Sequence, residues 1–435
     1  MASQGPEFSL LLPAKAGMPY LLFSVKSVLS ETRKDFELIV SVESRETESH
    51  LFLSTIQDSR LVVLVAPEGL SMSEHWDWVQ SHASGRWQMF VGQDDGIQPH
   101  FFELAAELIA VAEKFGIRAI ASSRAYLHWA GSRFDQTGHG RLIREVRHVV
   151  QIRDLKIDAM SALLGPKSYF DLPQMYTTSI FRSDLIDEVR AKQGGIFLTC
   201  HPQDANLAAL AIALERKYLF SGVPLGWVGT SPKSAGVAIS DVSAGFGKGR
   251  ERNVALASSY FASVENSKFE YPTYAGNFLL GDLSIYLWQA IRKTEELQDV
   301  RFRELMCSKV FVRKLVAKSW ATVRLREWSR KKSMLFELAS SNDVRVSVSF
   351  ALILFFFVIR EKLKGVAKFF RVLRRRVGWP QGSSVLFGGN ESNRVDPDSL
   401  PFREGRVPLP RLRGPHLRLE VSNRVKINRP STTKS

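Results

Sequence analysis

Cysteine is scarce in this chain, and so are the residue groupings that bind zinc. Its 435 residues include two cysteines, Cys200 and Cys307, far apart in the sequence. That spacing argues against a disulfide scaffold and is typical of a reducing compartment. No set of Cys and His residues has the spacing of a structural zinc site. We therefore expect a fold held by its hydrophobic core, for which the chain has ample length and apolar content.

Long hydrophobic runs are lacking as well. The opening sequence MASQGPEFSLLLPAKAG has neither the basic region nor the apolar stretch of a signal peptide. The run VSVSFALILFFFVI, residues 346–359, has 14 uncharged residues, whereas a helix that crosses a bilayer needs about 20. We therefore expect a cytoplasmic protein whose fold starts near its first residue.

Acidic residues are scarce in the C-terminal third. Residues 1–300 contain 29 Lys and Arg against 34 Asp and Glu, a net charge of −5, whereas residues 301–435 contain 30 against 10, a net charge of +20. Directly after the apolar run, REKLKGVAKFFRVLRRR mixes basic and apolar residues at helical spacing. This pattern predicts a segment that lies on an anionic membrane surface. A buried helix followed by a solvated basic helix is the alternative, and nucleic acid is a less supported partner because no aromatic RNA-binding motif is present.

What the first 130 residues do contain is an alternation of strand and helix patterns. FSLLLPA, FELIVSVES, LVVLVAPEG, RWQMFVGQDD and IRAIASSRAYLHW are apolar runs of the strand type, and segments with helical periodicity separate them. SMSEHW has the Ser and Glu of a capping box, which predicts the start of a helix. The alternation predicts an α/β fold with a mainly parallel sheet flanked by helices. Ligands of such folds bind beyond the carboxyl ends of the strands.

These segments, in this order, resemble the family 2 glycosyltransferases over roughly residues 7–240. SVLSETRKDFELIVSVES, ASGRWQMFVGQDDG, QDANL and GWVGTSPKSAG are similar to the family's second strand, acidic motif, "ED..L" element and a Gly/Ser loop. The resemblance implies a GT-A (Rossmann-like) fold. It also implies transfer of a sugar from a UDP- or GDP-linked donor to a glycan or a lipid-linked acceptor, with inversion, in surface polysaccharide biosynthesis. A retaining transferase and a non-catalytic sugar-nucleotide-binding protein remain alternatives.

The resemblance also implies a metal site at the end of the fourth strand. Asp94 and Asp95 would hold Mg²⁺ or Mn²⁺, hard cations that prefer carboxylate oxygens, and the cation would neutralise the leaving diphosphate. The family commonly has an Asp where this chain has Gly92, so the metal site depends on Asp94 and Asp95 alone. The alternative is that Asp95 caps the helix that follows.

Other donor-binding residues are also inferred from the resemblance. Pro13, Ala14 and Lys15 would lie under the nucleotide, although Lys15 could equally be an exposed surface residue. Glu43 would accept a hydrogen bond from the base, or else be a solvated acid. Lys233, in GTSPKSAG, would place its charge near the diphosphate, or else lie in a plain surface loop.

An inverting transfer needs a general base for the acceptor hydroxyl. Asp204 in QDANL is the first candidate and His201 the second, with a helix N-cap as the alternative role of Asp204. We expect His75 and Trp76 to pack in the core. His128 and Trp129 are weaker candidates for an acceptor sugar to stack on.

The chain is expected to divide into four parts. Residues 1–245 would form the glycosyltransferase domain and residues 246–340 a helical extension. Residues 341–380 would form the apolar and basic membrane-surface segment, and residues 381–435 a disordered basic tail.

Overall fold

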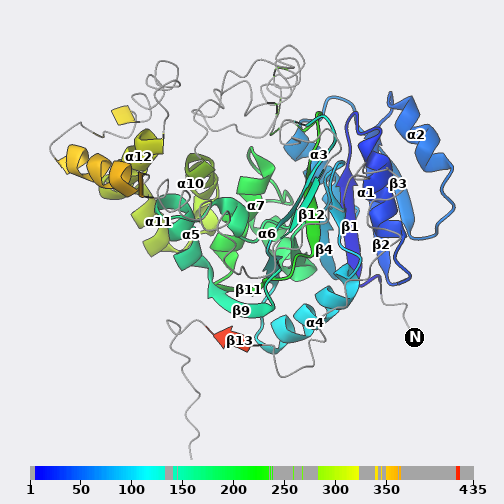
Figure 1. Cartoon of the computed structure of the whole chain (residues 1–435), viewed down its shortest axis with the longest axis horizontal. Helices are drawn as coiled ribbons and strands as arrows, with labels where there is room; N and C mark the ends of the chain where they lie inside the picture. Colours follow the sequence, from blue (N-terminus) through cyan, green and yellow to red (C-terminus); the bar gives the residue numbers. More distant parts are fainter. Residues whose placement is uncertain are drawn as a thin grey trace, which may run out of the picture.

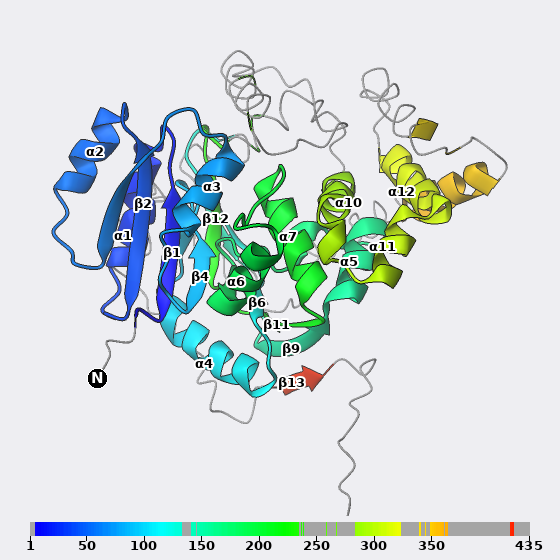
Figure 2. The same cartoon turned by 180° about the vertical axis from the view of Figure 1, so that it is seen from behind.

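The chain folds around a central sheet, with helices on both faces (Figures 1 and 2). The computed structural model describes residues 5–132, 141–144, 146–234, 236, 238, 258, 267, 283–322, 339–340, 344, 349–360, 362–363 and 418–421. Its strands are β1 (Phe8–Pro13), β2 (Phe36–Glu43), β3 (Leu61–Ala66), β4 (Trp87–Phe90), β5 (Gly96–Ile97), β6 (Ala119–Ser122), β7 (Ala125–His128), β8 (Arg141–Arg144), β9 (Val149–Asp154), β10 (Ser179–Arg182), β11 (Lys217–Ser221), β12 (Gly226–Thr230) and β13 (Arg418–Val421).

Helices connect most of these strands. They are α1 (Tyr20–Leu29), α2 (Thr47–Ser54), α3 (Met72–Gln80), α4 (Phe101–Lys114), α5 (Leu155–Leu164), α6 (Ser183–Lys192), α7 (Gln203–Leu214), α10 (Leu283–Lys293), α11 (Val300–Cys307) and α12 (Lys309–Thr322), with short 3₁₀ turns η1 (Tyr169–Asp171) and η2 (Glu295–Leu297). The predicted capping box at the start of α3 is confirmed, since the Ser71 side chain accepts from the Glu74 N–H and the Glu74 side chain accepts from the Ser71 N–H.

The main sheet has the strand order β13-β9-β11-β6-β10-β4-β1-β2-β3. Strands β1 to β4 pair in parallel, and β6 and β11 point the same way because β10 is antiparallel to both β4 and β6. The strands β9, β10 and β13 run in the opposite direction. The predicted α/β fold with a mainly parallel sheet flanked by helices is therefore confirmed.

The strand sequences explain the two helical layers. All six residues of β1 are buried, as expected for a parallel strand covered on both faces. Because side chains alternate across a strand, Leu10 and Leu12 face the layer that contains α1 and α4, while Leu11 faces the layer that contains α3, α5 and α7. Trp76 stacks on Phe90 in this second layer. The expectation that Trp76 packs in the core is therefore confirmed.

A second, smaller sheet lies beside the carboxyl end of β4. Its order is β5-β12-β7-β8. The segment predicted as one fifth strand region divides between the two sheets, because β6 belongs to the main sheet and β7 to the smaller one. In the smaller sheet β12 pairs with β5, which follows Asp95 directly, so the turn after β12 is brought against the acidic pair.

The part of the chain after residue 282 adds helices at one end of the molecule. Helices α10, α11 and α12 and a further helix at residues 349–360 lie there, while α2 lies at the opposite end in both views (Figures 1 and 2). Among the described residues no helix is both long and apolar enough to cross a membrane. β13 belongs to the segment predicted to be disordered, and it adds a strand beside β9; the rest of residues 381–435 lies outside the described residues. The predicted domain boundaries remain predictions.

Candidate functional site

The carboxyl ends of β1, β2 and β4 meet at one edge of the sheet, as their parallel pairing requires. Side-chain contacts join these three ends. Lys15, two residues after β1, places its Nζ 2.7 Å from Oε1 of Glu43, the last residue of β2. Its backbone N–H donates to the Gln93 side chain after β4 at 2.8 Å. The predicted nucleotide residues Lys15 and Glu43 therefore lie in one site with the acidic motif.

Glu43 is buried and carries two cationic partners. Arg45 lies 2.7 Å from its second carboxylate oxygen. Burial pushes the pKa of Glu43 upward, but hydrogen bonds from Lys15 and Arg45 outweigh burial and hold this pKa below its ordinary value. Glu43 is thus an ion-paired carboxylate rather than a solvated acid. Pro13 and Ala14 are buried at the end of β1.

The carboxylate of Asp95 is fully engaged by the protein. Its Oδ1 accepts from the Gly229 N–H at 2.6 Å. Its Oδ2 accepts from the Thr177 hydroxyl at 2.7 Å and from the Gly92 N–H at 3.1 Å. The buried Tyr176 hydroxyl is a further hydrogen-bonding partner. Asp95 therefore joins three segments of the site, at Gly92, at Tyr176 and Thr177, and at Gly229.

This arrangement explains why an acid is missing at position 92. A Cβ atom on Gly92 would lie 2.5 Å from Oδ2 of Asp95 and 2.7 Å from the Tyr176 hydroxyl oxygen. The space of a third side chain is thus taken by the second acid of the motif. The alternative interpretation of Asp95 as a helix cap is wrong, because His100 occupies the N-cap position of α4 and makes no side-chain cap hydrogen bond.

Two of the partners of Asp95, Tyr176 and Thr177, lie in a segment with strained backbone angles. Met175 and Thr177 have φ angles of 49° and 40°, which are uncommon for residues other than glycine and, for a β-branched residue, mark real strain. Between them, Tyr176 bridges to Phe90 at the end of β4. The sequence QMYTTS has no pattern that signals this role.

Asp94 accepts hydrogen bonds from the turn after β12. Its Oδ2 accepts from the Ser231 N–H at 3.2 Å and from the Ser234 hydroxyl. In the same turn, Lys233 donates from its Nζ to the carbonyl oxygens of Ala16 at 3.1 Å and Met18 at 2.6 Å. The 231–234 turn therefore spans from the acidic pair to the loop after β1. Lys233 lies beside the acidic pair with its ammonium group on backbone carbonyls, and its predicted role near a diphosphate stays a prediction.

The two adjacent acids share one buried environment. Burial raises the pKa of Asp94, although hydrogen bonds from Ser234 and Ser231 oppose this rise. Burial and the neighbouring charge of Asp94 raise the pKa of Asp95 to about 6. In mildly acidic solution the pair is therefore partly protonated, as expected for two close carboxylates that are removed from water.

A divalent cation at the acidic pair would have to share its carboxylates with hydrogen-bond donors of the protein. Oδ2 of Asp95 accepts from the Thr177 hydroxyl and the Gly92 N–H, and Oδ1 accepts from the Gly229 N–H, while the predicted role of Asp95 as a metal ligand stays a prediction. The Ser231 N–H and the Ser234 hydroxyl both donate to Oδ2 of Asp94, and the Ser231 side chain is a further partner of this carboxylate. Within the described part of the chain, no group of three or more His, Cys, Asp or Glu residues could hold a metal ion. Any cation here would need its remaining ligands from substrate and water.

The predicted acceptor platform is wrong for Trp129. Its indole is buried among Tyr20, Phe23 and Trp227. Its Nε1–H donates to the backbone oxygen of Asp94 at 2.9 Å. Trp129 therefore supports the acidic pair from behind and offers no face for a sugar to stack on.

Asp204 lies in the first turn of α7, where it makes two contacts. Its Oδ2 accepts from the Tyr169 hydroxyl at 3.2 Å, and its Oδ1 accepts from the Ala205 N–H at 2.9 Å. The N-cap position belongs to Pro202, so the alternative role of Asp204 as N-cap is wrong. Burial raises the pKa of Asp204, which makes its carboxylate a stronger base than a solvated aspartate.

His201 and His75 are buried rather than presented to a ligand. The ring nitrogens of His201 lie 2.7 Å from the Ser73 hydroxyl and 3.2 Å from the Ser267 hydroxyl. The Nε2 atom of His75 lies 2.8 Å from the Ser41 hydroxyl, and burial lowers the pKa of both rings to about 4. The expectation that His75 packs in the core is confirmed.

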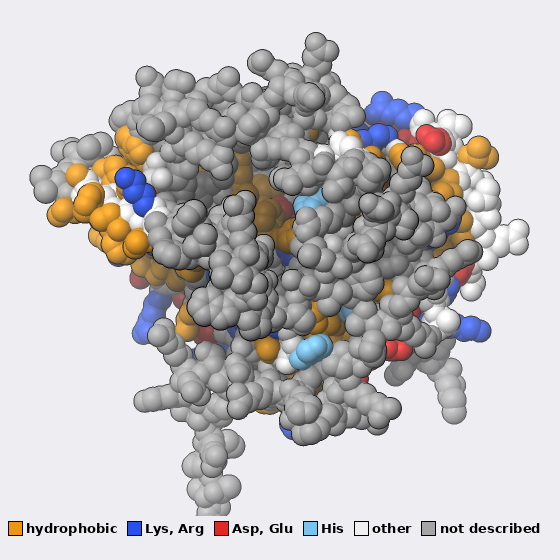
Figure 3. Space-filling model, viewed as in Figure 1, with side chains coloured by type: hydrophobic (Ala, Val, Ile, Leu, Met, Phe, Trp, Pro, Cys, Tyr) orange, Lys and Arg blue, Asp and Glu red, His pale blue; other side chains and the backbone are white. Residues whose placement is uncertain are grey.

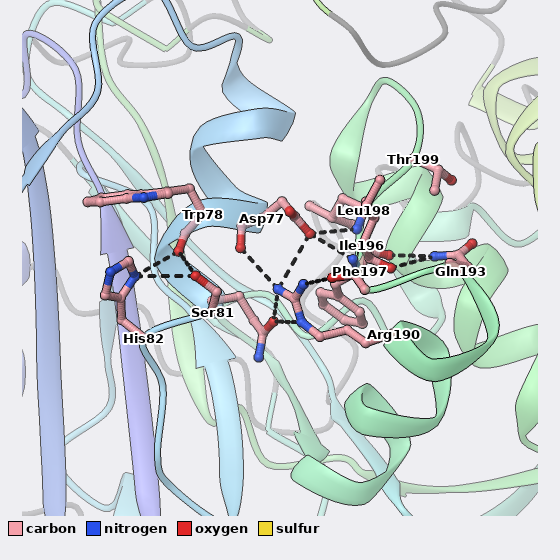
Figure 4. Close-up of polar contacts among 12 residues, drawn as sticks. Asp77, Trp78, Ser81, His82, Arg190, Gln193, Ile196, Phe197, Leu198 and Thr199 are labelled. Atoms are coloured by element: carbon pink, nitrogen blue, oxygen red, sulfur yellow. Dashed lines mark hydrogen bonds and ion pairs between the residues drawn. The ribbon is translucent and has the colours of Figure 1, made fainter.

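A clamp centred on Asp77 holds the segment that leads to Asp204 (Figure 4). Oδ1 of this α3 residue accepts from the N–H groups of Phe197 and Leu198 at 2.8 and 3.0 Å. Arg190 of α6 lies 3.5 Å from the same oxygen and donates from its Nη1 to the Gly195 carbonyl. The position of Asp204 thus depends on contacts made well before it in the chain.

Arg124 is a charged residue of the site that the sequence did not single out. It lies in the short link between β6 and β7, with its Nε donating to the Phe170 carbonyl at 2.9 Å and its Nη2 donating to the Gln174 side chain. Its positive charge acts on both Asp204 and Tyr176. Because Tyr176 contacts Asp95, the charge of Arg124 acts on a neighbour of the acidic pair as well as on the candidate base. No motif distinguishes it from other basic residues.

Comparisons with known proteins give remote structural similarities. No protein-family model matches this chain, and no curated protein matches it. Among solved structures, S. aureus TarS residues 1–349 in complex with UDP-GlcNAc is 12% identical, with a TM-score of 0.40, over 77% of this chain and 80% of that chain. The mannosyltransferase PcManGT from Pyrobaculum calidifontis, in complex with GDP-Man and Mn²⁺, is 12% identical, with a TM-score of 0.37, over 78% of this chain and 88% of that chain. Because these similarities are so remote, any proposal about the function of this chain must be argued from its own residues.

Proposed function

We propose that this protein is a glycosyltransferase that moves a sugar from a nucleoside-diphosphate sugar to a glycan or lipid-linked acceptor. One observation carries the proposal: the loop after β4, which contains a buried acidic pair, is joined by hydrogen bonds to the segments after β1 and β12, and an ion pair joins the segment after β1 to the end of β2. This edge is where α/β folds bind nucleotides. The family 2 resemblance of the sequence motifs supports the same function. The nucleotide-sugar ligands named for TarS and the mannosyltransferase are compatible with it, although structures this remote carry no argument.

The donor would occupy the space beside Lys15, Glu43 and Asp94. The base and ribose would lie over the ends of β1 and β2. Opening of the Lys233 contacts would free one ammonium group for the diphosphate, and Lys15 would supply another. Asp94 Oδ1 would hold a Mg²⁺ or Mn²⁺ ion, which when bound supplies Lewis-acid neutralisation of the leaving diphosphate.

Asp204 would act as the general base. An inverting transfer needs one carboxylate that takes the proton of the attacking hydroxyl. The Tyr169 hydroxyl and the Ala205 N–H orient the Asp204 carboxylate, and burial makes it more basic. Most of the rate would come from alignment of the acceptor and stabilisation of the diphosphate charge.

The test is a donor screen with the purified full-length protein. A panel of UDP- and GDP-sugars is incubated with and without Mn²⁺, and turnover is measured by mass spectrometry, with UDP and GDP binding measured by calorimetry. We expect one donor to turn over. Asp204→Asn should lower that turnover by about 10² to 10⁴-fold, with nucleotide affinity unchanged.

The outcomes separate the alternatives. Nucleotide binding without turnover of any donor would favour a non-catalytic sugar-nucleotide-binding protein. Retention of configuration in the product would favour a retaining transferase. If neither UDP nor GDP binds, the proposal is wrong.

A further inference from the structure

The helix at residues 349–360 is covered on one side only. Phe350 and Phe357 are buried in the main core, with the Phe350 ring 5.7 Å from that of Trp320 on α12. Arg360 donates from its Nη1 to the Leu164 carbonyl oxygen at the end of α5. The helix is therefore attached firmly to the body of the protein by this face.

The opposite face is apolar and exposed. Leu352, Phe355, Phe356 and Leu363 each expose 60% or more of their surface, and Ile359 is also exposed. Their spacing of three, four, seven and eleven residues from Leu352 aligns them on one side of a helix. Figure 3 shows hydrophobic side chains gathered at the left end of the molecule, where Figure 1 places this helix. We call these five side chains the apolar stripe.

Positive charge follows the apolar stripe directly. Residues 360–376 read REKLKGVAKFFRVLRRR, with eight basic residues and one acidic residue. A partner for this region must therefore offer both an apolar layer and negative charge. An anionic bilayer surface offers both, with acyl chains beneath the phosphate and carboxylate headgroups.

We propose that the apolar stripe is a membrane-docking face, with which the protein lies on an anionic lipid surface. In this proposal the helix lies in the interface plane, with the apolar stripe toward the acyl chains and the buried face toward the protein. Buried anchors on one face and the lipid on the other would fix the protein's orientation against the membrane. This docking is independent of the proposed sugar transfer.

The test is vesicle co-sedimentation of the full-length protein. Vesicles of phosphatidylcholine with about 30% phosphatidylserine are compared with pure phosphatidylcholine vesicles. We expect sedimentation with the anionic vesicles that weakens as salt is raised. The double variant Phe355→Ser/Phe356→Ser should lower the partition coefficient at least about tenfold, because two large apolar side chains no longer enter the interface.

A matched control is available at the far end of the molecule. Leu51 on α2 is 68% exposed, so Leu51→Ser removes a similarly exposed apolar side chain and should leave vesicle binding unchanged. Arg374→Gln/Arg375→Gln/Arg376→Gln tests the charge separately and should weaken binding to anionic vesicles only. Thermal unfolding of each variant confirms that it is folded.

Each of the following results would overturn the proposal. The wild-type protein could fail to sediment with anionic vesicles. The double variant could bind as well as the wild type, or Leu51→Ser could weaken binding as much. A dimer in light scattering that the double variant dissociates, without vesicle binding, would assign the apolar stripe to self-association instead.

Discussion

Restoring the missing acid of the motif should damage this protein. The family pattern commonly has Asp where this chain has Gly92, so Gly92→Asp is the change that sequence comparison alone would recommend. In the structure, a Cβ atom at this position would meet Oδ2 of Asp95 at 2.5 Å and the Tyr176 hydroxyl oxygen at 2.7 Å. Real Cβ atoms essentially never approach other atoms within 3.0 Å, so the Asp95 carboxylate and the Tyr176 hydroxyl must shift and their buried hydrogen bonds are strained.

The size of the effect follows from packing and charge. Overpacking of a filled interior costs about 1–3 kcal/mol. Each kcal/mol lowers Tm by about 2–4 °C for a domain of 150–250 residues, so Gly92→Ala should melt about 2–12 °C below the wild type. Gly92→Asp should melt lower still, because it adds a third carboxylate beside two buried ones.

The assay is thermal unfolding by circular dichroism, with Mn²⁺ binding measured by calorimetry. Gly5→Ala is the matched control, because a Cβ there would lie at an ordinary 3.5 Å from the Ser84 carbonyl oxygen. Its Tm should be unchanged or slightly raised. If Gly92→Ala melts within about 1 °C of the wild type, the close packing around Asp95 is refuted. If Gly92→Asp remains stable and binds Mn²⁺ more tightly, Asp95 is a metal ligand after all.

Two further predictions concern the same site. The pKa of Asp95 is raised to about 6, so the proton of Asp95 stabilises the folded state below pH 4, and this stabilisation is lost as the pH rises through 6. We therefore compare the unfolding free energies of the wild type and Asp95→Asn, measured by urea titration. The wild-type value minus the variant value should fall by up to about 3 kcal/mol between pH 4 and 7. A constant difference would contradict the shift. Asp77→Ala should lower the unfolding free energy by about 1–3 kcal/mol for each N–H group left unpaired, and it should lower turnover because Asp204 is displaced. Asp77→Asn should keep much of the stability and of the turnover, since its amide oxygen still accepts hydrogen bonds. Equal losses in the two variants would refute the clamp.

The layout of the sheet was predictable because it depends on local patterns. Apolar runs separated by helical periodicity predicted the parallel strands, and Ser71 with Glu74 predicted the start of α3. The division of the fifth strand region between two sheets was missed. Nothing local distinguishes β6 from β7, because the difference lies in their pairing with distant strands.

The acidic motif was located correctly, but its chemistry was not fully predictable. Asp94 and Asp95 are neighbours in the chain, yet one faces the 231–234 turn and the other is enclosed by Gly92, Thr177 and Gly229. Those partners come from up to 134 residues away, and no pattern in the sequence joins them. The prediction that Trp129 offers a stacking face was wrong for the same reason, since its burial depends on aromatic neighbours from α1 and β12.

The turn at residues 231–234 has a consequence for how tightly any ligand can bind. Its Ser231 and Ser234 occupy the Asp94 carboxylate, and its Lys233 occupies carbonyl oxygens of the loop after β1. A ligand that needs these groups competes with the chain's own contacts. Its apparent dissociation constant is therefore the intrinsic one divided by the fraction of molecules in which the turn is open. A substitution that weakens the turn's contacts without touching the ligand would then raise the protein's affinity for that ligand. Tight binding thus requires a donor whose own contacts outweigh those of the turn.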